Sequence, residues 1–152
     1  PEDIKFGNNV WLSAYGPHSW DYVAQVTPEQ PNLTIPRGKA TGGSSAINGQ
    51  VLFRGIPEDY DGWAEMGNDE WSFIKVLPYF NKLETDLDFS GDFHGSDGPV
   101  PVKRYPRSEW LPYASAFEDA CVAVGYEVDE DMNHPESTGV SPRAGQRCQC
   151  RR

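Results

Sequence analysis

The sequence predicts a loop-rich α+β chain whose core is incomplete. Proline and glycine are frequent, with 13 and 15 of the 152 residues, and the hydrophobic fraction of 38% is low for a compact domain. The 5 tryptophans, 7 tyrosines and 7 phenylalanines nevertheless argue against a wholly disordered chain. We therefore expect one folded segment that needs neighbours outside it to complete its core.

Short strands and loops alternate in the expected order of elements. Residues 22–26 form a short apolar run typical of a strand. Residues 100–102 also predict a strand, and Pro101 should confine it to a sheet edge because proline cannot donate to a ladder. Residues 85–110 and 127–140 are rich in Gly, Asp or Pro and are interpreted as surface loops.

Helices are predicted in two regions. Residues 57–84 should form short helices, since Pro57 suits a first helical position, Gly67 a helix end, and Pro78 should interrupt the next helix. Residues 111–125 give the clearest helical pattern, ended by a glycine. The apolar residues that recur at helical spacing are Tyr113, Phe117, Ala120, Cys121 and Val124. We expect the apolar faces at Trp63, Phe80 and Phe117 to pack on segments outside this chain.

A loop rich in glycine and serine, residues 37–49, is the strongest candidate binding motif. Backbone N–H groups of a glycine-rich turn that leads into a helix suit a phosphate or pyrophosphate, and Lys39 could add charge. Either Ser44 or Ser45 could cap the helix. The motif matches neither the P-loop nor the G-x-G-x-x-G fingerprint. From spacing alone, a tight turn without a ligand is slightly favoured.

Catalytic and metal-binding constellations are weak. The histidines, His18, His94 and His134, all lie in loops without an oriented partner, so we expect exposed or structural roles. The acidic run 129–131 lacks EF-hand spacing and is interpreted as a solvated loop. Three cysteines form neither a disulfide framework nor a zinc site.

The charge distribution narrows the classes of partner. A net charge of −10 disfavours nucleic acid and anionic membranes, and no apolar run reaches transmembrane length. Residues 141–152 contain four arginines and no acid, which suggests a tail of different origin. The chain has no initiator methionine, so we expect its natural N-terminus to lie elsewhere. The cellular location stays open, with the cytoplasm favoured.

A long set of motifs carries a family resemblance. It runs from the glycine loop through Arg54-Gly55, then the motif DYDGW at 59–63, WSF at 71–73, VLPYF at 76–80, HGSDGP at 94–99 and TGV at 138–140. In this order the motifs resemble the glucose–methanol–choline (GMC) oxidoreductases over roughly residues 20–143. The resemblance implies an α/β parent fold, a Rossmann-like FAD domain joined to a substrate domain built on an antiparallel sheet.

The resemblance also implies a division of the chain. Residues 1–94 would be a partial FAD-binding domain, with a cofactor loop at 37–55 and a lid segment at 55–84. Residues 95–145 would begin the substrate-binding domain, and 146–152 would be an aberrant, disordered tail. The chain is thus expected to be a truncated piece of the parent fold.

The cofactor implied by the family is FAD. The residues expected to lie along it are Gly42, Gly43, Ser44, Asn48, Gly49 and Val51. Some members bind the flavin covalently through a histidine at the position of Ile47, so noncovalent FAD is expected here. No residue matches the family's catalytic histidine, and the chain alone is expected to be inactive.

The implied activity is transfer of a hydride from an alcohol-type substrate to flavin, as in choline or alcohol dehydrogenases and oxidases. The expected partner is therefore a small-molecule alcohol, and the oligomeric state stays open. Two alternatives remain: a non-redox FAD protein similar to hydroxynitrile lyases, or a catalytically inactive truncated product.

Overall fold

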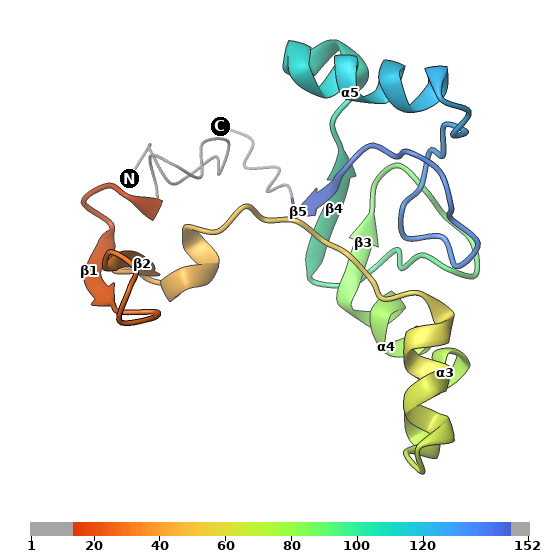
Figure 1. The fold of residues 1–152 in the computed structure, drawn as a ribbon. Coiled ribbons are helices and arrows are strands. Elements are labelled where there is room, and N and C mark those ends of the chain that lie inside the picture. Colours follow the sequence, from red (N-terminus) through yellow and green to blue (C-terminus); the bar gives the residue numbers. More distant parts are fainter. Residues whose placement is uncertain (1–13, 147–152) are drawn as a thin grey trace. The chain divides into compact units, whose positions relative to one another are not determined.

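The computed structural model describes residues 14–146, which belong to two compact units divided between Gln50 and Val51. In this described part the fold is mixed α/β, with three α-helices and two small sheets, as expected for a loop-rich piece (Figure 1). The predicted domain boundary at 94/95 lies inside the second unit. That boundary concerns the parent fold and stays a prediction.

The first unit contains an antiparallel hairpin and a short 3-10 helix. Strands β1 (Ser19–Ala24) and β2 (Leu33–Gly38) pair along their whole length. The predicted strand at 22–26 is therefore real but begins earlier, at Ser19. Helix η1 (Gly43–Ala46) follows after the start of the glycine loop.

The sheet of the second unit has the order β3-β4-β5, formed by Glu84–Asp86, Val100–Arg104 and Ala144–Gln146. Strand β4 is parallel to β3 and antiparallel to β5. The prediction of an edge strand at 100–102 is wrong, because β4 is central. Among the described residues, β5 pairs with Val102 to Arg104, and Pro101 pairs with Thr85 of β3.

The helices largely follow their sequence signals. They are α3 (Pro57–Glu65), α4 (Phe73–Leu83) and α5 (Pro112–Ala123). Proline begins α3 and α5, and glycines at positive φ, Gly67 and Gly125, follow them. The predicted break at Pro78 is wrong, since α4 continues through it. Pro78 has no N–H to donate to the Ile74 carbonyl one turn earlier, and Ile74 is 71% exposed, so water can reach this turn of the helix.

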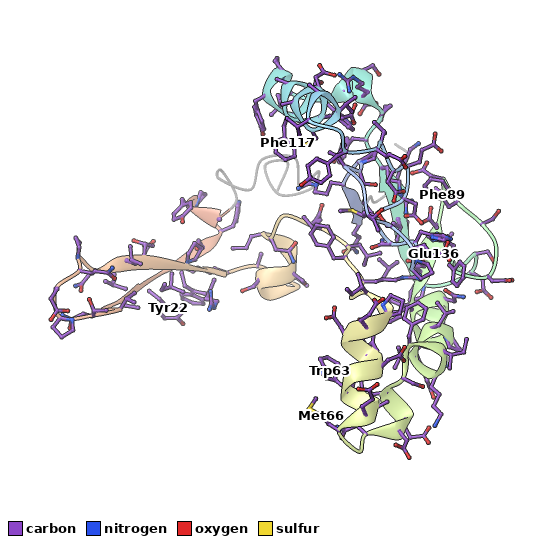
Figure 2. All side chains as sticks on the ribbon, turned by 45° about the vertical axis from the view of Figure 1, so that its right-hand side comes forward. Tyr22, Trp63, Met66, Phe89, Phe117 and Glu136 are labelled. Atoms are coloured by element: carbon purple, nitrogen blue, oxygen red, sulfur yellow. The ribbon has the colours of Figure 1, made fainter. Side chains whose placement is uncertain are left out.

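Apolar faces of the helices lie open rather than in a core. Phe117 of α5 is 65% exposed and Trp63 of α3 is 45% exposed (Figure 2). These open faces at Trp63 and Phe117 agree with the expectation that they pack on segments outside this chain, and the buried residue of α5 is Glu118, which pairs with Arg107. Open faces of this size normally mark contact surfaces. No helix among residues 14–146 is long and apolar enough to cross a membrane.

Residues 85–110 are not a surface excursion. They contribute the fully buried Val102 and several buried charged side chains. The segment His94–Pro99 wraps around β3 because two glycines allow close backbone approach: a Cβ on Gly95 would lie 1.8 Å from the carbonyl oxygen of Asn81. A Cβ on Gly98 would lie 2.4 Å from the backbone nitrogen of Glu84. Sequence patterns hid this core because its side chains are mostly charged.

The predicted tail at 146–152 is described only at its first residue. Gln146 belongs to β5 and pairs with Val102, so the expectation of disorder is wrong for Gln146. The other six residues lie outside the described part of the chain, and so does the prediction made for them.

Candidate cofactor loop and its buried support

The glycine loop forms a tight turn in left-handed backbone geometry. Gly42 has φ 93° and Gly43 has φ 60°. The N–H of Gly43 donates to the carbonyl of Ala40 at 2.8 Å, which closes the turn ahead of η1. A Cβ on Gly43 would meet no atom within 4 Å. The turn therefore presents backbone, without side chains, to open space.

The serines of the loop do not cap η1, contrary to expectation. The N-cap is Gly42, without a side-chain hydrogen bond. The Ser45 hydroxyl donates to the Gly42 carbonyl at 2.7 Å, and Ser44 Oγ accepts from the Gly38 N–H at 3.1 Å. These bonds hold the turn shut, so the serines stabilise the loop. Ser44 is exposed, and a hydroxyl that accepts one bond can still donate its proton elsewhere.

A second turn ends the loop. The Asn48 side-chain oxygen accepts from the Gln50 N–H at 2.8 Å, and Gln50 has φ 51°, which is uncommon for a residue with a side chain. Val51, 38% exposed, belongs to the second unit, where it bridges Gly145 of β5. The five other predicted site residues thus lie together in one loop, and Val51 lies on the segment that leaves it.

This loop fits a flat, anionic cofactor. Exposed glycines at positive φ let a ligand approach the backbone closely, which a β-carbon would prevent. Ile47, 4% exposed, is buried behind the loop and offers no nucleophilic nitrogen. The helix dipole that supports phosphate binding elsewhere is small here, because η1 has only four residues.

Beyond the loop, the chain enters a buried cluster of charged side chains. Arg54 Nη2 lies 2.6 Å from Glu84 Oε1, and both side chains are at most 3% exposed. Arg54 also donates to the Phe93 carbonyl at 2.5 Å. These bonds join the segment after the glycine loop to β3 and to the loop that carries His94.

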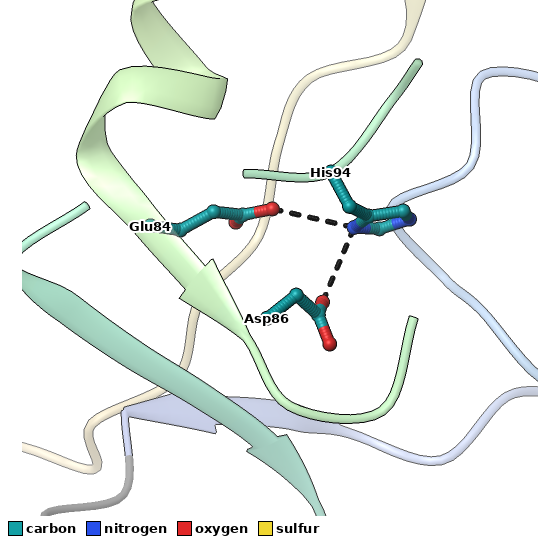
Figure 3. A group of neighbouring side chains, drawn as sticks. All are labelled: Glu84, Asp86 and His94. Atoms are coloured by element: carbon teal, nitrogen blue, oxygen red, sulfur yellow. Dashed lines mark hydrogen bonds and ion pairs between the residues drawn. The ribbon is translucent and has the colours of Figure 1, made fainter. Parts of the chain in front are cut away.

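Carboxylates contact both ring nitrogens of His94. Its Nδ1 lies 3.2 Å from Glu84 and 3.1 Å from Asp86 (Figure 3). Its Nε2 lies 2.8 Å from Asp131, which Figure 3 does not draw. The ring is buried and both of its nitrogens have partners, which agrees with a structural role, one of the two roles expected from the sequence.

Glu84, Asp86 and His94 could in principle hold a metal, since their donor atoms lie within 4.8 Å of one another. The carboxylates already have cationic partners, however. Glu84 binds Arg54, and both oxygens of Asp86 accept from Arg104 at 2.9 and 2.8 Å. With Asp131, the cluster contains three acids, two arginines and one histidine, all within contact distance of one another's partners. We interpret the group as a structural ion-pair cluster.

The expectation that the acidic run 129–131 is a solvated loop is wrong for Asp131. This residue is 7% exposed, and its Oδ1 lies 2.6 Å from Arg104 Nη2. It is thus a buried partner of two cations rather than a solvated loop charge. Glu130 beside it is exposed, as predicted.

The pKa of Asp86 reflects its setting in this cluster. Burial raises the pKa, but hydrogen bonds from the N–H of Asp88, the guanidinium of Arg104 and the N–H of Phe89 outweigh that effect. The net result is a pKa below the usual value of 3.8. The ionised form of Asp86 therefore stabilises the fold.

Sequence analysis missed Asn133. Its side-chain amide donates to the Leu52 carbonyl at 3.2 Å and accepts from the Arg54 N–H at 3.0 Å. No periodicity or motif singles out this asparagine, because its partners lie about 80 residues away. Arg54 itself stood in the motif series, but nothing local indicated its buried partners.

Comparison with known proteins places the chain in a family. The family model described as GMC oxidoreductase matches residues 13–152. The chain belongs to this family. An uncharacterized GMC-type oxidoreductase of Rhodococcus erythropolis is 39% identical over 123 residues, covering 81% of this chain and 24% of the relative. The oxygen-dependent choline dehydrogenase of Sinorhizobium medicae is 38% identical, covering 86% of this chain and 24% of the relative.

Solved structures show the same fold. Pyridoxine 4-oxidase from Mesorbium loti superposes with a TM-score of 0.84 at 27% identity, over 98% of this chain and 30% of that one. An FAD-dependent oxidoreductase from Chaetomium thermophilum gives a TM-score of 0.70 at 26% identity, over 91% of this chain and 25% of that one. The GMC chain described here thus spans about a quarter of the length of the curated relatives it matches.

Proposed function

We propose that this chain supplies the flavin-contacting segment of an FAD-dependent oxidoreductase that oxidises an alcohol-type substrate. The observation that carries the proposal is the glycine turn at Gly42 and Gly43, with positive φ at both residues and open space beside Gly43, in a chain of the GMC family. Relatives named as a choline dehydrogenase and a pyridoxine oxidase support a substrate with a CH–OH group. Bound FAD would accept the hydride from that carbon.

The roles of this chain's residues would be binding and orientation. Backbone at Gly42, Gly43 and Gly49 would lie along the cofactor, and the hydroxyl of Ser44 would donate to an anionic oxygen. Asn48 and Val51 would complete the contact. Binding would be noncovalent, because the buried Ile47 cannot form a bond to the flavin.

Proton abstraction would fall to residues outside the chain. His94 is held by three carboxylates, and the His134 ring packs edge-on against Phe93 with centroids 5.0 Å apart, so both rings are already engaged within the chain. We accordingly propose that the chain alone does not turn over alcohols.

The experiment is anaerobic addition of choline or a simple primary alcohol to the full-length protein that carries this segment. Flavin absorbance near the visible maximum should bleach as the substrate is oxidised. A flavin that stays oxidised with every alcohol, in a protein that cleaves cyanohydrins, would instead favour the non-redox alternative. A full-length protein without flavin would contradict the proposal.

A further inference from the structure

We propose that Asn133 is a positioning residue for the flavin site, one that fixes the segment through which the glycine loop leaves. The inference rests on the proposed function. Asn133 lies in a loop 79 residues after Arg54 and 81 after Leu52, and its side-chain amide bonds both residues of the exit segment, residues 51–54.

The side-chain amide of Asn133 makes the hydrogen bonds that a neighbouring β-strand would otherwise make to residues 52 and 54. The Leu52 N–H donates to the Ala144 carbonyl of β5 at 3.1 Å, which pairs the exit segment with the sheet. After this bond, the next two backbone groups bond the Asn133 side chain rather than β5. These groups are the Leu52 carbonyl and the Arg54 N–H. A donor and an acceptor on one planar group match this pair, as a peptide unit would.

Asn133 is itself held rigidly. It is 5% exposed, and its own N–H donates to Asp131 Oδ1 at 3.1 Å. The same oxygen binds Arg104 in the buried cluster. The position of the amide is therefore set by the ion-pair cluster, and its bonds are shielded from competing water.

The consequence for the flavin site follows from chain connectivity. Val51 precedes Leu52, whose two backbone groups are both bonded, so the backbone at Val51 has little freedom to shift. Arg54, two residues further, is tied down at its N–H by Asn133 and at its guanidinium by Glu84. Asn133 thereby positions a predicted cofactor contact that it does not touch.

Asn133→Asp separates positioning from simple loss of packing. The substitution keeps the size and one oxygen, but it places a second oxygen against the Leu52 carbonyl where a donor stood. Asn68→Asp is the matched control, because Asn68 is exposed and its side chain donates to the Trp63 carbonyl at 3.1 Å, outside the exit segment. Asn133→Ala provides a second variant without the added charge.

The measurement is amide hydrogen exchange of the whole 152-residue chain by NMR, with FAD titrated into the same samples. In Asn133→Asp, the Arg54 amide should exchange about tenfold faster, while the amide of the buried Val102 stays slow. The FAD concentration needed to shift the Val51 resonance should rise several-fold, and Asn68→Asp should change neither quantity.

Three other results would each be decisive. Unchanged Arg54 exchange in both Asn133 variants would overturn the inference. Faster Arg54 exchange with unchanged FAD affinity would also overturn it, because the clamp would then not position the flavin site. A wild-type chain whose glycine loop does not respond to FAD, but whose Arg54 responds to the substitution, would contradict the proposed function instead.

Discussion

Asp131→Ala should destabilise the second unit because it removes a buried acid from between two cations. Asp131 lies 2.6 Å from Arg104 and 2.8 Å from His94, and it accepts the Asn133 N–H at 3.1 Å. Removing one partner of a buried ion pair costs about 3–5 kcal/mol. Arg104 would keep Asp86, and His94 would keep Glu84, so the lower end of that range applies.

The expected loss in free energy of unfolding is therefore about 3 kcal/mol, a large part of the 5–15 kcal/mol typical of a domain. Urea unfolding at neutral pH, followed by tryptophan fluorescence, measures it. Glu130→Ala is the matched control, since Glu130 is the exposed neighbour. If both variants unfold at the same urea concentration, the cluster does not support the fold as argued. Asp131→Asn, which keeps an acceptor, should fall between them.

Three further predictions concern the loop, the flavin and acid. Gly43→Val should weaken FAD binding more than Gly67→Val, because both sites have positive φ and open space but only Gly43 lies in the proposed site; equal FAD affinity in the two variants would refute the assignment. Acid precipitation of the flavin-loaded full-length protein should release all flavin, and flavin bound to the pellet would contradict noncovalent binding. The pKa of Asp86 is lower in the folded than in the unfolded state, so its contribution to stability is present above about pH 4 and is lost as the pH falls through the folded pKa. Between about pH 5 and about pH 3, the urea midpoint should therefore depend less on pH in Asp86→Asn than in the wild type.

Local signals in the sequence predicted local structure well. Pro57 and Gly67 bounded α3, and a glycine followed α5, because backbone stereochemistry at a helix end depends on one residue. The glycine loop was also recognisable, since positive φ at Gly42 and Gly43 is a property of the residues themselves.

Nonlocal structure could not be predicted in the same way. The central place of β4 depends on β5, some 40 residues later, and Pro101 gave the opposite indication. The charged core was missed because buried acids and arginines look like surface residues until their partners are known, as with Asp131 and Arg104. The glycine loop proposed as the cofactor site was recognisable in the sequence, but the contact of Asn133 with the segment after it was not.

The open apolar faces explain why the chain is expected to bind FAD weakly by itself. Trp63 and Phe117 are 45% and 65% exposed, and the chain covers only 24% of the length of each of these two relatives. The proposed cofactor contacts form one loop and the segment that leaves it. A ligand the size of FAD would need further contacts for tight binding.

The most direct test of the account is an NMR titration of the isotope-labelled 152-residue chain with FAD. Chemical-shift changes should concentrate at residues 42–51, and the dissociation constant for FAD should be larger than micromolar. A different site is available for comparison: a cavity of about 290 Å³ lined by Phe89, Phe93 and acidic residues, including Asp129. Shifts that concentrate around that cavity, or no shifts at residues 42–51 at any FAD concentration, would contradict the claim that the glycine loop contacts the flavin cofactor.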